Sequence, residues 1–579
     1  PIRAELFGVE RLEQHAESLA AAQTVFSELR PGQLLLSRVA ENGRVLQESY
    51  RVIAKAIQEE HVVTPAAEWL VDNFHIVDEQ LREIYDDLPP GFYYQLHKLA
   101  SGHLQDYPRV FGVAWAFVAH TDSRFDPEIL SRFVAAYQRV QPLTIGELWA
   151  VAITLRVVLV ENLRRLTERI VHSRAGRQDA DGLADSVLGA RGEPSVFPAS
   201  ELRRFEHQPL PMAFAVQLVQ RLRDLDPKVR PVLLWLDERL AAQGTTADEM
   251  VRTEHQQQAA MSVTVRNIIM SMRLMSVCDW SDFVETVSLV DERLRRGTHF
   301  AEMDFGTRDH YRHAIEDLSR DSGLSEIEVT DRVVMRATGA RTEPRHPAQS
   351  HGDRYTEPGY YLISEGRLEF EREIGCRISW KHRLLRLYIR SAVPGYLGSL
   401  AVATGLILAL PLLVAALVEV ETYWLVLLGC LAAVPASDLA MALVNRAVMA
   451  LLGPRTLPRL ELKQGIPDDL RTLVAVPSLL TTVQALNEQV ERLEVHYLAN
   501  SDGALHFALI TDWVDAPTET LAGDDAVLAA AANGMARLNQ RYGPMPDGRS
   551  RFLLLHRRRV WNESEQRWMV WERKRGKLH

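Results

Sequence analysis

The sequence predicts a multidomain chain with a large all-α amino-terminal region, a two-helix transmembrane hairpin and part of a Rossmann-like α/β domain. Three observations support this fold class. Apolar residues recur at three- and four-residue spacing over residues 12–337, two long apolar runs follow, and the last part alternates short strand-like runs with helical stretches. At 579 residues the chain is also too long for a single hydrophobic core.

Residues 1–340 are predicted to form a helical cytosolic region. Thr64 and Asp126 each precede a proline, a residue that suits the first position of a helix because its missing N–H would have no partner there. Three further helix starts have the spacing of reciprocal capping boxes: Thr144 with Glu147, Thr246 with Glu249, and Ser325 with Glu328. Residues 175–200 and 338–358 are rich in loop-forming residues, and the second stretch is predicted to end the helical region.

Charge and cysteine content exclude some classes of protein. The net charge of −10 argues against nucleic acid as a partner, because phosphate binding needs a concentrated positive surface. The three cysteines, Cys278, Cys376 and Cys430, lie far apart and match no metal spacing. No signal peptide is evident, so we expect a cytosolic amino terminus. The chain starts without methionine and stops inside a motif, and we therefore expect a fragment of a longer protein.

A membrane hairpin is predicted over residues 391–452, after a linker and basic juxtamembrane segment over 341–390. Residues 398–418 carry no charge, and residues 423–444 carry only Asp438. The turn between them is acidic, whereas arginines and lysines lie on both outer flanks. The positive-inside rule therefore predicts a multi-pass protein of a bacterial inner membrane, with both flanks in the cytosol.

Two alternatives stay open for this hairpin. The two apolar runs form either a membrane anchor or a helical hairpin that is buried in the core of a soluble protein, because both have this composition. Asp438 is either a functional carboxylate or a residue that packs against neighbouring helices.

Residues 453–579 predict a parallel sheet with crossover helices. Strands are expected at 473–476, 506–511 and 551–556, with helices at 480–493 and 525–541 between them. Ligands bind outside the carboxyl ends of such strands. The pattern therefore places Pro477, Asp512 and His556 at one edge of the sheet.

Several residues near this edge suit a nucleotide diphosphate. Asp512 can accept hydrogen bonds from a uracil or ribose, although an Asp at a strand end is also a common turn or cap residue, and Asp515 invites the same two interpretations. The arginines and lysines near the end of the chain either neutralise a diphosphate or form a solvated face: Arg557, Arg558, Arg559, Arg573, Lys574, Arg575 and Lys577.

Long motifs resemble those of a known family. The segments PRTLPRLELKQGIPD, TLVAVPSLL, LEVHYLANSDGALHFALITDWVDA and RFLLLHRRRVWNESEQRWMVWERKRGKL resemble the start of the glycosyltransferase family 84 domain of cyclic β-1,2-glucan synthases. The opening PIRAELFGVERLEQHAESLAAAQ and the segment LTIGELWAVAITLRVVLVENLRRL look like the amino-terminal region of the same proteins.

The resemblance implies a partial domain of the glycosyltransferase-A type and assigns roles to some of its residues. Pro477 matches a proline near the nucleotide base, and Asp512 matches a carboxylate that contacts the uridine. Lys574, Arg575, Gly576, Lys577 and Leu578 match a Lys-x-Gly-x-Leu element that approaches the diphosphate. The family's metal-binding aspartates, its catalytic base and its acceptor-binding motif are expected beyond His579. This chain alone is therefore expected to bind no metal and to be inactive.

For the full-length enzyme, the resemblance implies inverting glucose transfer from UDP-glucose, with Mg or Mn, onto the 2-hydroxyl of a growing β-1,2-glucan. Its partners would be the lipid bilayer and the downstream transferase, cyclisation and phosphorylase-like domains, with the helical region as a scaffold. Two rivals remain: a membrane-anchored helical interaction protein with a non-catalytic α/β domain, and a processive transferase that makes a linear glucan.

Overall fold

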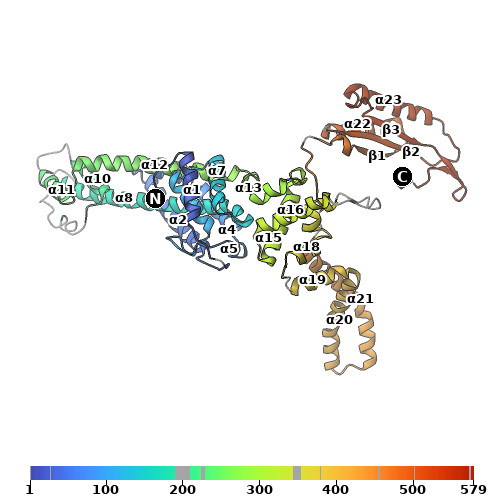
Figure 1. Ribbon diagram of the computed structural model, residues 1–579, viewed down its shortest axis with the longest axis horizontal. Coiled ribbons are helices and arrows are strands. Elements are labelled where there is room, and N and C mark those ends of the chain that lie inside the picture. The colour runs from blue at the N-terminus through green and yellow to red at the C-terminus, as the bar shows by residue number, and fades with distance from the viewer. Residues whose placement is uncertain are drawn as a thin grey trace. The chain divides into compact units, whose positions relative to one another are not determined.

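The computed structural model describes residues 2–26, 28–188, 202, 209–222, 229–342, 354–377, 380–453, 457–463, 465–500, 503–572 and 575–578. The chain divides into two compact units, which are drawn in Figure 1. The first unit comprises Pro1–Thr298 and His310–Met441, and the second comprises His299–Asp309 and Ala442–His579.

The main core of the first unit is built around α8 (Ile145–Leu188). Most side chains between Ile145 and Leu163 are buried, as expected of a helix that is apolar on all sides. It packs against α2 (Leu35–Gln58), α6 (Arg109–His120), α10 (Met212–Leu222) and α12 (Ala247–Val277). The same region contains α1 (Val9–Ala22), α3 (Pro65–Asp72), α4 (Phe74–Asp87), α5 (Pro90–Gln95), α7 (Pro127–Val140), α11 (Arg230–Ala242), α13 (Trp280–Val287) and α14 (Leu289–Arg295).

Several predicted helix starts are confirmed. The carboxylate of Asp126 accepts hydrogen bonds from two backbone N–H groups at the start of α7. The backbone N–H of Thr144 donates to Glu147 at 3.0 Å, and the N–H of Glu147 donates back to the Thr144 hydroxyl at 3.2 Å. Ser325 and Glu328 exchange the same two bonds at 2.8 and 3.2 Å. These pairs satisfy backbone donors that a helix start would otherwise leave without partners.

Two other predicted caps form only in part. Thr246 accepts a hydrogen bond from the N–H of Glu249, which is one half of a capping box. Thr64 makes no capping hydrogen bond with its side chain, so the prediction at this residue is wrong. Pro65 nevertheless occupies the first turn of α3, and its restricted φ favours the start of a helix without that bond.

The loop predicted at residues 175–200 is wrong as far as Leu188, because α8 continues to that residue. Ala180, Leu183 and Ala184 recur at helical spacing and pack in a second core cluster with residues of α10. Burial of this apolar stripe outweighs the local glycine and aspartate residues. Residues 189–200 lie outside the part that the structure describes.

The segment before the apolar hairpin is also helical. It contains α15 (Phe305–Ser322), α16 (Glu326–Thr342), η4 (Arg354–Thr356), α17 (Pro358–Ile363), α18 (Arg367–Glu373) and α19 (Trp380–Arg390). The fully buried Arg312 of α15 bonds Asp291 of α14 at 2.6 and 2.9 Å and Glu285 of α13 at 2.9 Å, which ties α15 to both helices. The stretch predicted as a linker therefore carries three short α-helices where it is described.

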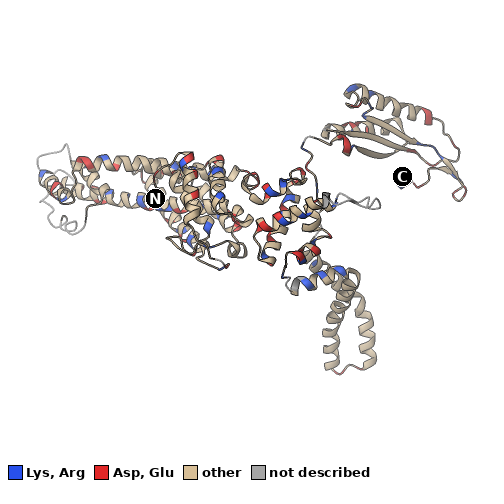
Figure 2. Ribbon diagram, viewed as in Figure 1, with Lys and Arg blue, Asp and Glu red and all other residues tan. Residues whose placement is uncertain are grey.

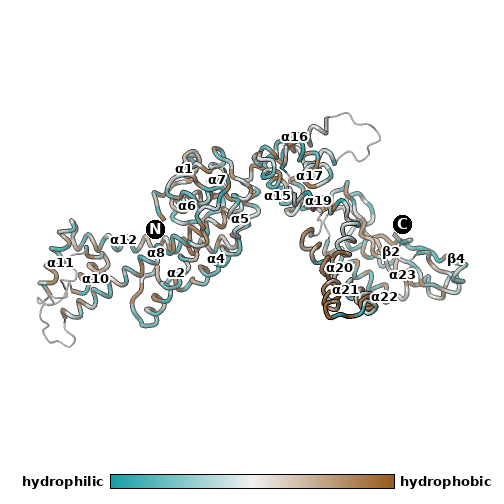
Figure 3. Tube along the Cα trace, turned by 90° about the horizontal axis from the view of Figure 1, so that it is seen from below, coloured by the Kyte–Doolittle hydropathy of each residue, from teal (hydrophilic) through white to brown (hydrophobic). Residues whose placement is uncertain are grey.

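Two helices, α20 (Ala392–Leu417) and α21 (Thr422–Leu452), are long and apolar enough to cross a membrane. They form a hairpin, and Figure 3 shows the hydrophobic colour concentrated on it. None of the most apolar window of α20 and only 11% of that of α21 is buried. A hairpin in the core of a soluble protein would be covered, so this exposure favours the membrane interpretation. Asp438 is exposed on α21, and both interpretations of it remain predictions.

The second unit contains the predicted parallel sheet. Strands β1 (Thr472–Leu480), β2 (Leu505–Trp513) and β3 (Phe552–Arg557) lie in the order β1-β2-β3, and both pairings are parallel. The crossover helices α22 (Val483–Ala499) and α23 (Asp524–Tyr542) pack on each other and on the sheet. The unit also contains the hairpin β4 (Val560–Asn562) and β5 (Arg567–Met569), the short helices η3 (Phe300–Glu302) and η5 (Asp468–Leu470), and α24 (Arg575–Leu578).

The strand predicted to end at Pro477 continues to Leu480. β1 is an edge strand of the described sheet. A proline on an edge strand can lie where its missing N–H would face solvent, so no hydrogen bond between strands is lost. The extra residues matter for the site, since they bring Leu479 beside Asp512 in the register of the sheet.

Candidate functional site

The candidate site lies at the carboxyl end of β2, where Asp512 is flanked by Leu479 of β1 and Arg557 of β3. Side chains alternate between the two faces of a strand. Leu509 and Trp513 lie in the core cluster under the crossover helices, so Asp512 points to the opposite face. This edge is where parallel α/β sheets bind ligands.

Asp512 is fully buried and bound by two cations. The guanidinium of Arg557 donates from Nε at 2.8 Å and from Nη2 at 2.9 Å, a bidentate pair. The ammonium of Lys577 lies 3.0 Å from Oδ2, the oxygen that also accepts from Nη2 of Arg557, and it donates to the carbonyl oxygen of Ser478 at 2.9 Å. A residue of β3 and a residue of α24 thus meet at one carboxylate of β2.

The two cations keep Asp512 ionised. Burial by itself raises the pKa of this carboxyl, but hydrogen bonds and charge from Arg557 and Lys577 outweigh burial and lower its pKa below the usual value. The cluster as a whole carries an excess positive charge, since two cations face one carboxylate. It is therefore suited to an anionic ligand.

The donors that remain determine what the cluster can bind. Lys577 uses two of its three N–H donors, which leaves one. Arg557 uses two donors on Asp512 and one on the carbonyl of Trp571, which leaves two of its five. Asp512 is fully buried and holds these two cations in place. Direct contact between its carboxylate and a uridine would require one of the cations to move.

Gly576 is required by a close approach of the chain to this cluster. A Cβ at this position would lie 2.7 Å from the carbonyl oxygen of Trp571 and 2.9 Å from Nη1 of Arg557. Real Cβ atoms do not approach other atoms so closely. The glycine between Arg575 and Lys577 therefore lets α24 lie against Arg557.

The other predicted site residues are placed differently. Pro477 is exposed and pairs with Ile510, two register positions before Asp512 and therefore on the same face of the sheet. Arg575 is 81% exposed and faces Glu572 at 3.7 Å, away from Asp512. Lys574 and Arg573 lie outside the described residues. The structure thus brings Asp512 and Lys577 together.

The run Arg557, Arg558, Arg559 does not act as one basic cluster. Arg559 has a fully buried side chain that pairs with Asp524 at 2.5 Å and donates to the carbonyl oxygens of Val514 and Glu519. Arg558 is exposed. Of the three, Arg557 is the one that reaches Asp512, because β3 ends at Arg557 and the two arginines after it lie beyond the strand.

His556 lies one register position before Arg557, and its Nδ1 is 3.0 Å from the hydroxyl of Thr511. Burial lowers the pKa of this imidazole. Its Nε2 is buried without a hydrogen-bond partner among the residues described. The sequence places His556 at the edge correctly, whereas the contributions of Ser478 and Trp571 have no sequence signal.

The described residues do not fit a metal ion. They contain no group of three or more His, Cys, Asp or Glu side chains that could hold one. Asp512, the predicted uridine contact, is already engaged by two cations. No chemical step is therefore assigned to a metal at this site.

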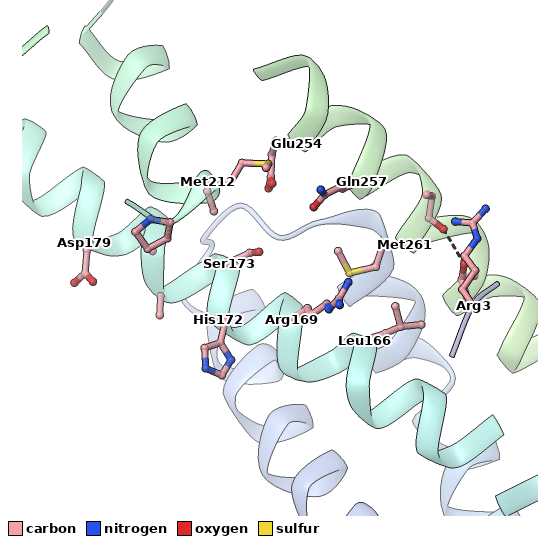
Figure 4. A pocket seen from close by; sticks show the side chains of 16 residues that line it. Arg3, Leu166, Arg169, His172, Ser173, Asp179, Met212, Glu254, Gln257 and Met261 are labelled. Atoms are coloured by element: carbon pink, nitrogen blue, oxygen red, sulfur yellow. Dashed lines mark hydrogen bonds between the residues drawn. The ribbon is translucent and has the colours of Figure 1, made fainter. Parts of the chain in front are cut away.

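The helical unit contains a separate cavity of about 550 Å³ between α8, α10 and α12, shown in Figure 4. Arg169 and His172 lie at one wall, and Met212 and Met261 supply apolar surface. Glu254 is held by Arg177 at 3.2 Å. The labelled side chains form no nucleophile, base and orienting group within hydrogen-bond reach of one another, so we assign this cavity no catalytic role.

Two helices that are long and apolar enough to cross a membrane and a small parallel sheet with a charged edge define the class of this protein: a mostly helical chain that includes an α/β unit. No model of a protein family matches the chain. The chain is 36% identical, over 587 aligned residues, to the cyclic β-(1,2)-glucan synthase NdvB of Rhizobium meliloti (strain 1021). The alignment covers the whole of this chain and 20% of that relative, so the chain spans about a fifth of its length.

This similarity confirms the resemblance that the motifs indicate. The chain is related to cyclic β-(1,2)-glucan synthases, and the relation extends over the helical region, the apolar hairpin and the sheet.

Proposed function

We propose that this chain contributes the diphosphate-binding edge of a UDP-glucose-dependent glucosyltransferase that makes cyclic β-1,2-glucan. The observation that carries the proposal is the cluster of Lys577, Asp512 and Arg557 at the carboxyl end of a parallel strand. The relation to a cyclic β-(1,2)-glucan synthase supports the glucan as the product, and UDP-glucose as the donor is part of the proposal.

In this proposal the two cations stabilise the charge that develops on the departing diphosphate. Asp512 holds Lys577 and Arg557 in place before the reaction, so these side chains need little reorganisation when negative charge develops on the diphosphate. The unused N–H donors of both residues contact the phosphate oxygens. The exposed Pro477 lies on the same face of the sheet, on the side where the base would lie.

The helices α20 and α21 anchor this unit to the bacterial inner membrane, with the sheet on the cytosolic side where UDP-glucose is found. The basic residues on both flanks of the hairpin and the acidic turn support this orientation. The metal, the catalytic base and the acceptor site belong to further parts of the full-length enzyme, as do the cyclisation and phosphorylase-like domains.

Titration calorimetry of the purified chain with UDP tests the diphosphate site. We expect Lys577→Met to weaken UDP binding about tenfold or more, because a charge-assisted hydrogen bond is lost. Arg575→Met is the matched control, since this cation belongs to the same motif but faces away. It should change the affinity less than twofold.

Equal losses in the two variants would mean that general charge, and not the described cluster, attracts UDP. Failure of the unaltered chain to bind UDP would remove the assignment. A further test on the full-length protein incubates membranes with labelled UDP-glucose and digests the polymer. Cyclic β-1,2-glucan is expected, whereas a linear product or none would favour one of the two rivals.

A further inference from the structure

Helix α19 (Trp380–Arg390) presents an apolar stripe that is largely exposed to solvent. Trp380, Leu384 and Leu387 lie at spacing i, i+4 and i+7 and thus on one side of the helix. They are 67%, 56% and 60% exposed. Arg383 and Arg390, also seven residues apart, are exposed on the helix. Each lies within about 90° of the centre of the stripe at 3.6 residues per turn, so they flank it on one side.

Other contacts of α19 hold the helix in this orientation. Arg386 donates to both oxygens of Glu371 in α18, at 2.6 and 2.7 Å. Tyr388 lies against Gly395 of α20, where a Cβ would come within 3.0 Å of its ring. Because the helix is held through these residues, the stripe stays directed outward from α18.

The position of α19 in the chain indicates what covers the stripe. A single residue, Ser391, separates α19 from α20, whose apolar side chains begin at once. Figure 2 shows basic residues on α19 and almost none on the hairpin that follows. An apolar stripe beside cations, directly before a membrane span, is the composition of a helix that lies in the bilayer surface. Trp prefers this interface, and arginine side chains extend from it to the headgroups.

We propose that α19 is an interfacial helix that recognises anionic phospholipids. Trp380, Leu384 and Leu387 lie at the boundary between headgroups and acyl chains, while Arg383 and Arg390 bind lipid phosphates. Continuity with α20 favours a bilayer over a protein partner as the occupant. The inference rests on the membrane insertion of α20 and α21 that the proposed function includes, and it adds the class of lipid recognised.

The test uses the 579-residue chain in nanodiscs, with its three cysteines replaced by serine and an environment-sensitive fluorophore on Leu387→Cys or Leu406→Cys. Discs contain either phosphatidylcholine alone or phosphatidylcholine with phosphatidylglycerol. We expect the label at 387 to report a shallow apolar environment that deepens with phosphatidylglycerol. The label at 406, in the middle of α20, should report the hydrocarbon in both discs.

Charge reversal tests the role of the arginines. In the same nanodiscs, the double variant Arg383→Glu and Arg390→Glu should lower the affinity for phosphatidylglycerol, read from the lipid fraction that gives half of the fluorescence change at position 387, by about fivefold or more for each arginine. The matched control is Arg44→Glu with Arg51→Glu, two arginines exposed on α2 at the same spacing, which should leave affinity unchanged. Circular dichroism checks that both variants fold. Arg386 is left intact because it bonds Glu371.

The outcomes separate this inference from the membrane anchor itself. If the label at 387 stays in water while that at 406 is in hydrocarbon, α19 is not interfacial and the inference fails alone. If both labels stay in water, the proposed anchor fails as well. Shielding at 387 that responds neither to lipid composition nor to charge reversal would mean that protein covers the stripe, which also overturns the inference.

Discussion

At the scale of single residues, Asp512 joins parts of the chain that are distant in the sequence. Arg557 lies 45 residues away, and Lys577 also binds a carbonyl 99 residues before it. The carboxylate is fully buried, so water does not reach it to take the place of either cation. A buried charge of this kind is stable only while its partners are present.

We expect Asp512→Asn to destabilise the second unit by about 3 kcal/mol at neutral pH, because two cations lose their counter-charge. The pKa of Asp512 is lowered in the folded state, whereas in the unfolded chain it is about 3.9. Its stabilisation is therefore fully present above about pH 4 and is lost as the pH falls through the folded pKa. Hydrogen exchange of β2 at pH 7 and pH 3 measures both effects. A variant as stable as the parent at pH 7 would contradict this account.

Gly576→Ala tests the close approach of α24. The added methyl group would overlap the carbonyl of Trp571 and the guanidinium of Arg557, so one of them must shift. We expect a loss of about 1–3 kcal/mol in stability and weaker UDP binding. Gly548 lies at a turn with a φ of +78°, and no atom lies within 4 Å of an added Cβ there. Gly548→Ala therefore measures the effect of backbone strain without a clash. Unchanged UDP affinity in Gly576→Ala would show that α24 does not position the site.

At the scale of elements, the start of α8 depends on contacts far beyond its capping box. Glu147 is completely buried and is bonded by Arg109 at 3.0 Å. Burial raises the pKa of this carboxyl, but the charge of Arg109 together with hydrogen bonds from Arg109 and His97 lowers it to about 2. The backbone N–H of Ile145 donates at 2.8 Å to Glu326, the first residue of α16. One helix start thus joins three elements.

Glu326 predicts a pH dependence of opposite sign. Burial and the negative charges of Glu316 and Glu147 raise its pKa to about 8, from about 4.3 in the unfolded chain. Its neutral form is favoured by folding, so stability is greatest below about pH 4 and falls as the pH rises to about 8. Glu326→Gln keeps an oxygen for Ile145 and removes this dependence. Thermal unfolding across pH 5–9 should show a Tm for the variant that exceeds the parent's at the alkaline end. A parallel decline in both proteins would contradict the raised pKa.

At the scale of the whole molecule, the proposed orientation predicts which parts of the chain lie outside the cytosol. In a cysteine-free background, Val420→Cys in the hairpin turn should react with an impermeant maleimide in intact cells with a permeabilised outer membrane. Leu457→Cys, after α21, should react only after lysis, because the positive-inside rule places this flank in the cytosol. Labelling of position 457 in intact cells would contradict the proposed function, since UDP-glucose would not reach the sheet.

Local patterns predicted those features that depend on neighbours a few residues apart. The capping boxes of Thr144 and Ser325, the two apolar runs and the order of strands and helices after them all depend on spacing within one element. Element ends were less accurate. The strand through Pro477 and the helix through residues 175–188 continue past their breakers, because an edge strand and an apolar stripe tolerate them.

The sequence by itself determined that the chain has a helical region, an apolar hairpin and a parallel sheet with a carboxylate at its edge, since periodicity and composition specify these. Tertiary structure decided that Arg557 and Lys577 bind Asp512, that Arg559 binds Asp524 and that Arg575 faces outward. The physical reason is that strand register and chain crossing determine which charges meet. In the run of three arginines, β3 ends at Arg557, which the register pairs with Asp512, and the chain then turns Arg559 toward Asp524, so the run by itself does not reveal which arginine reaches the site.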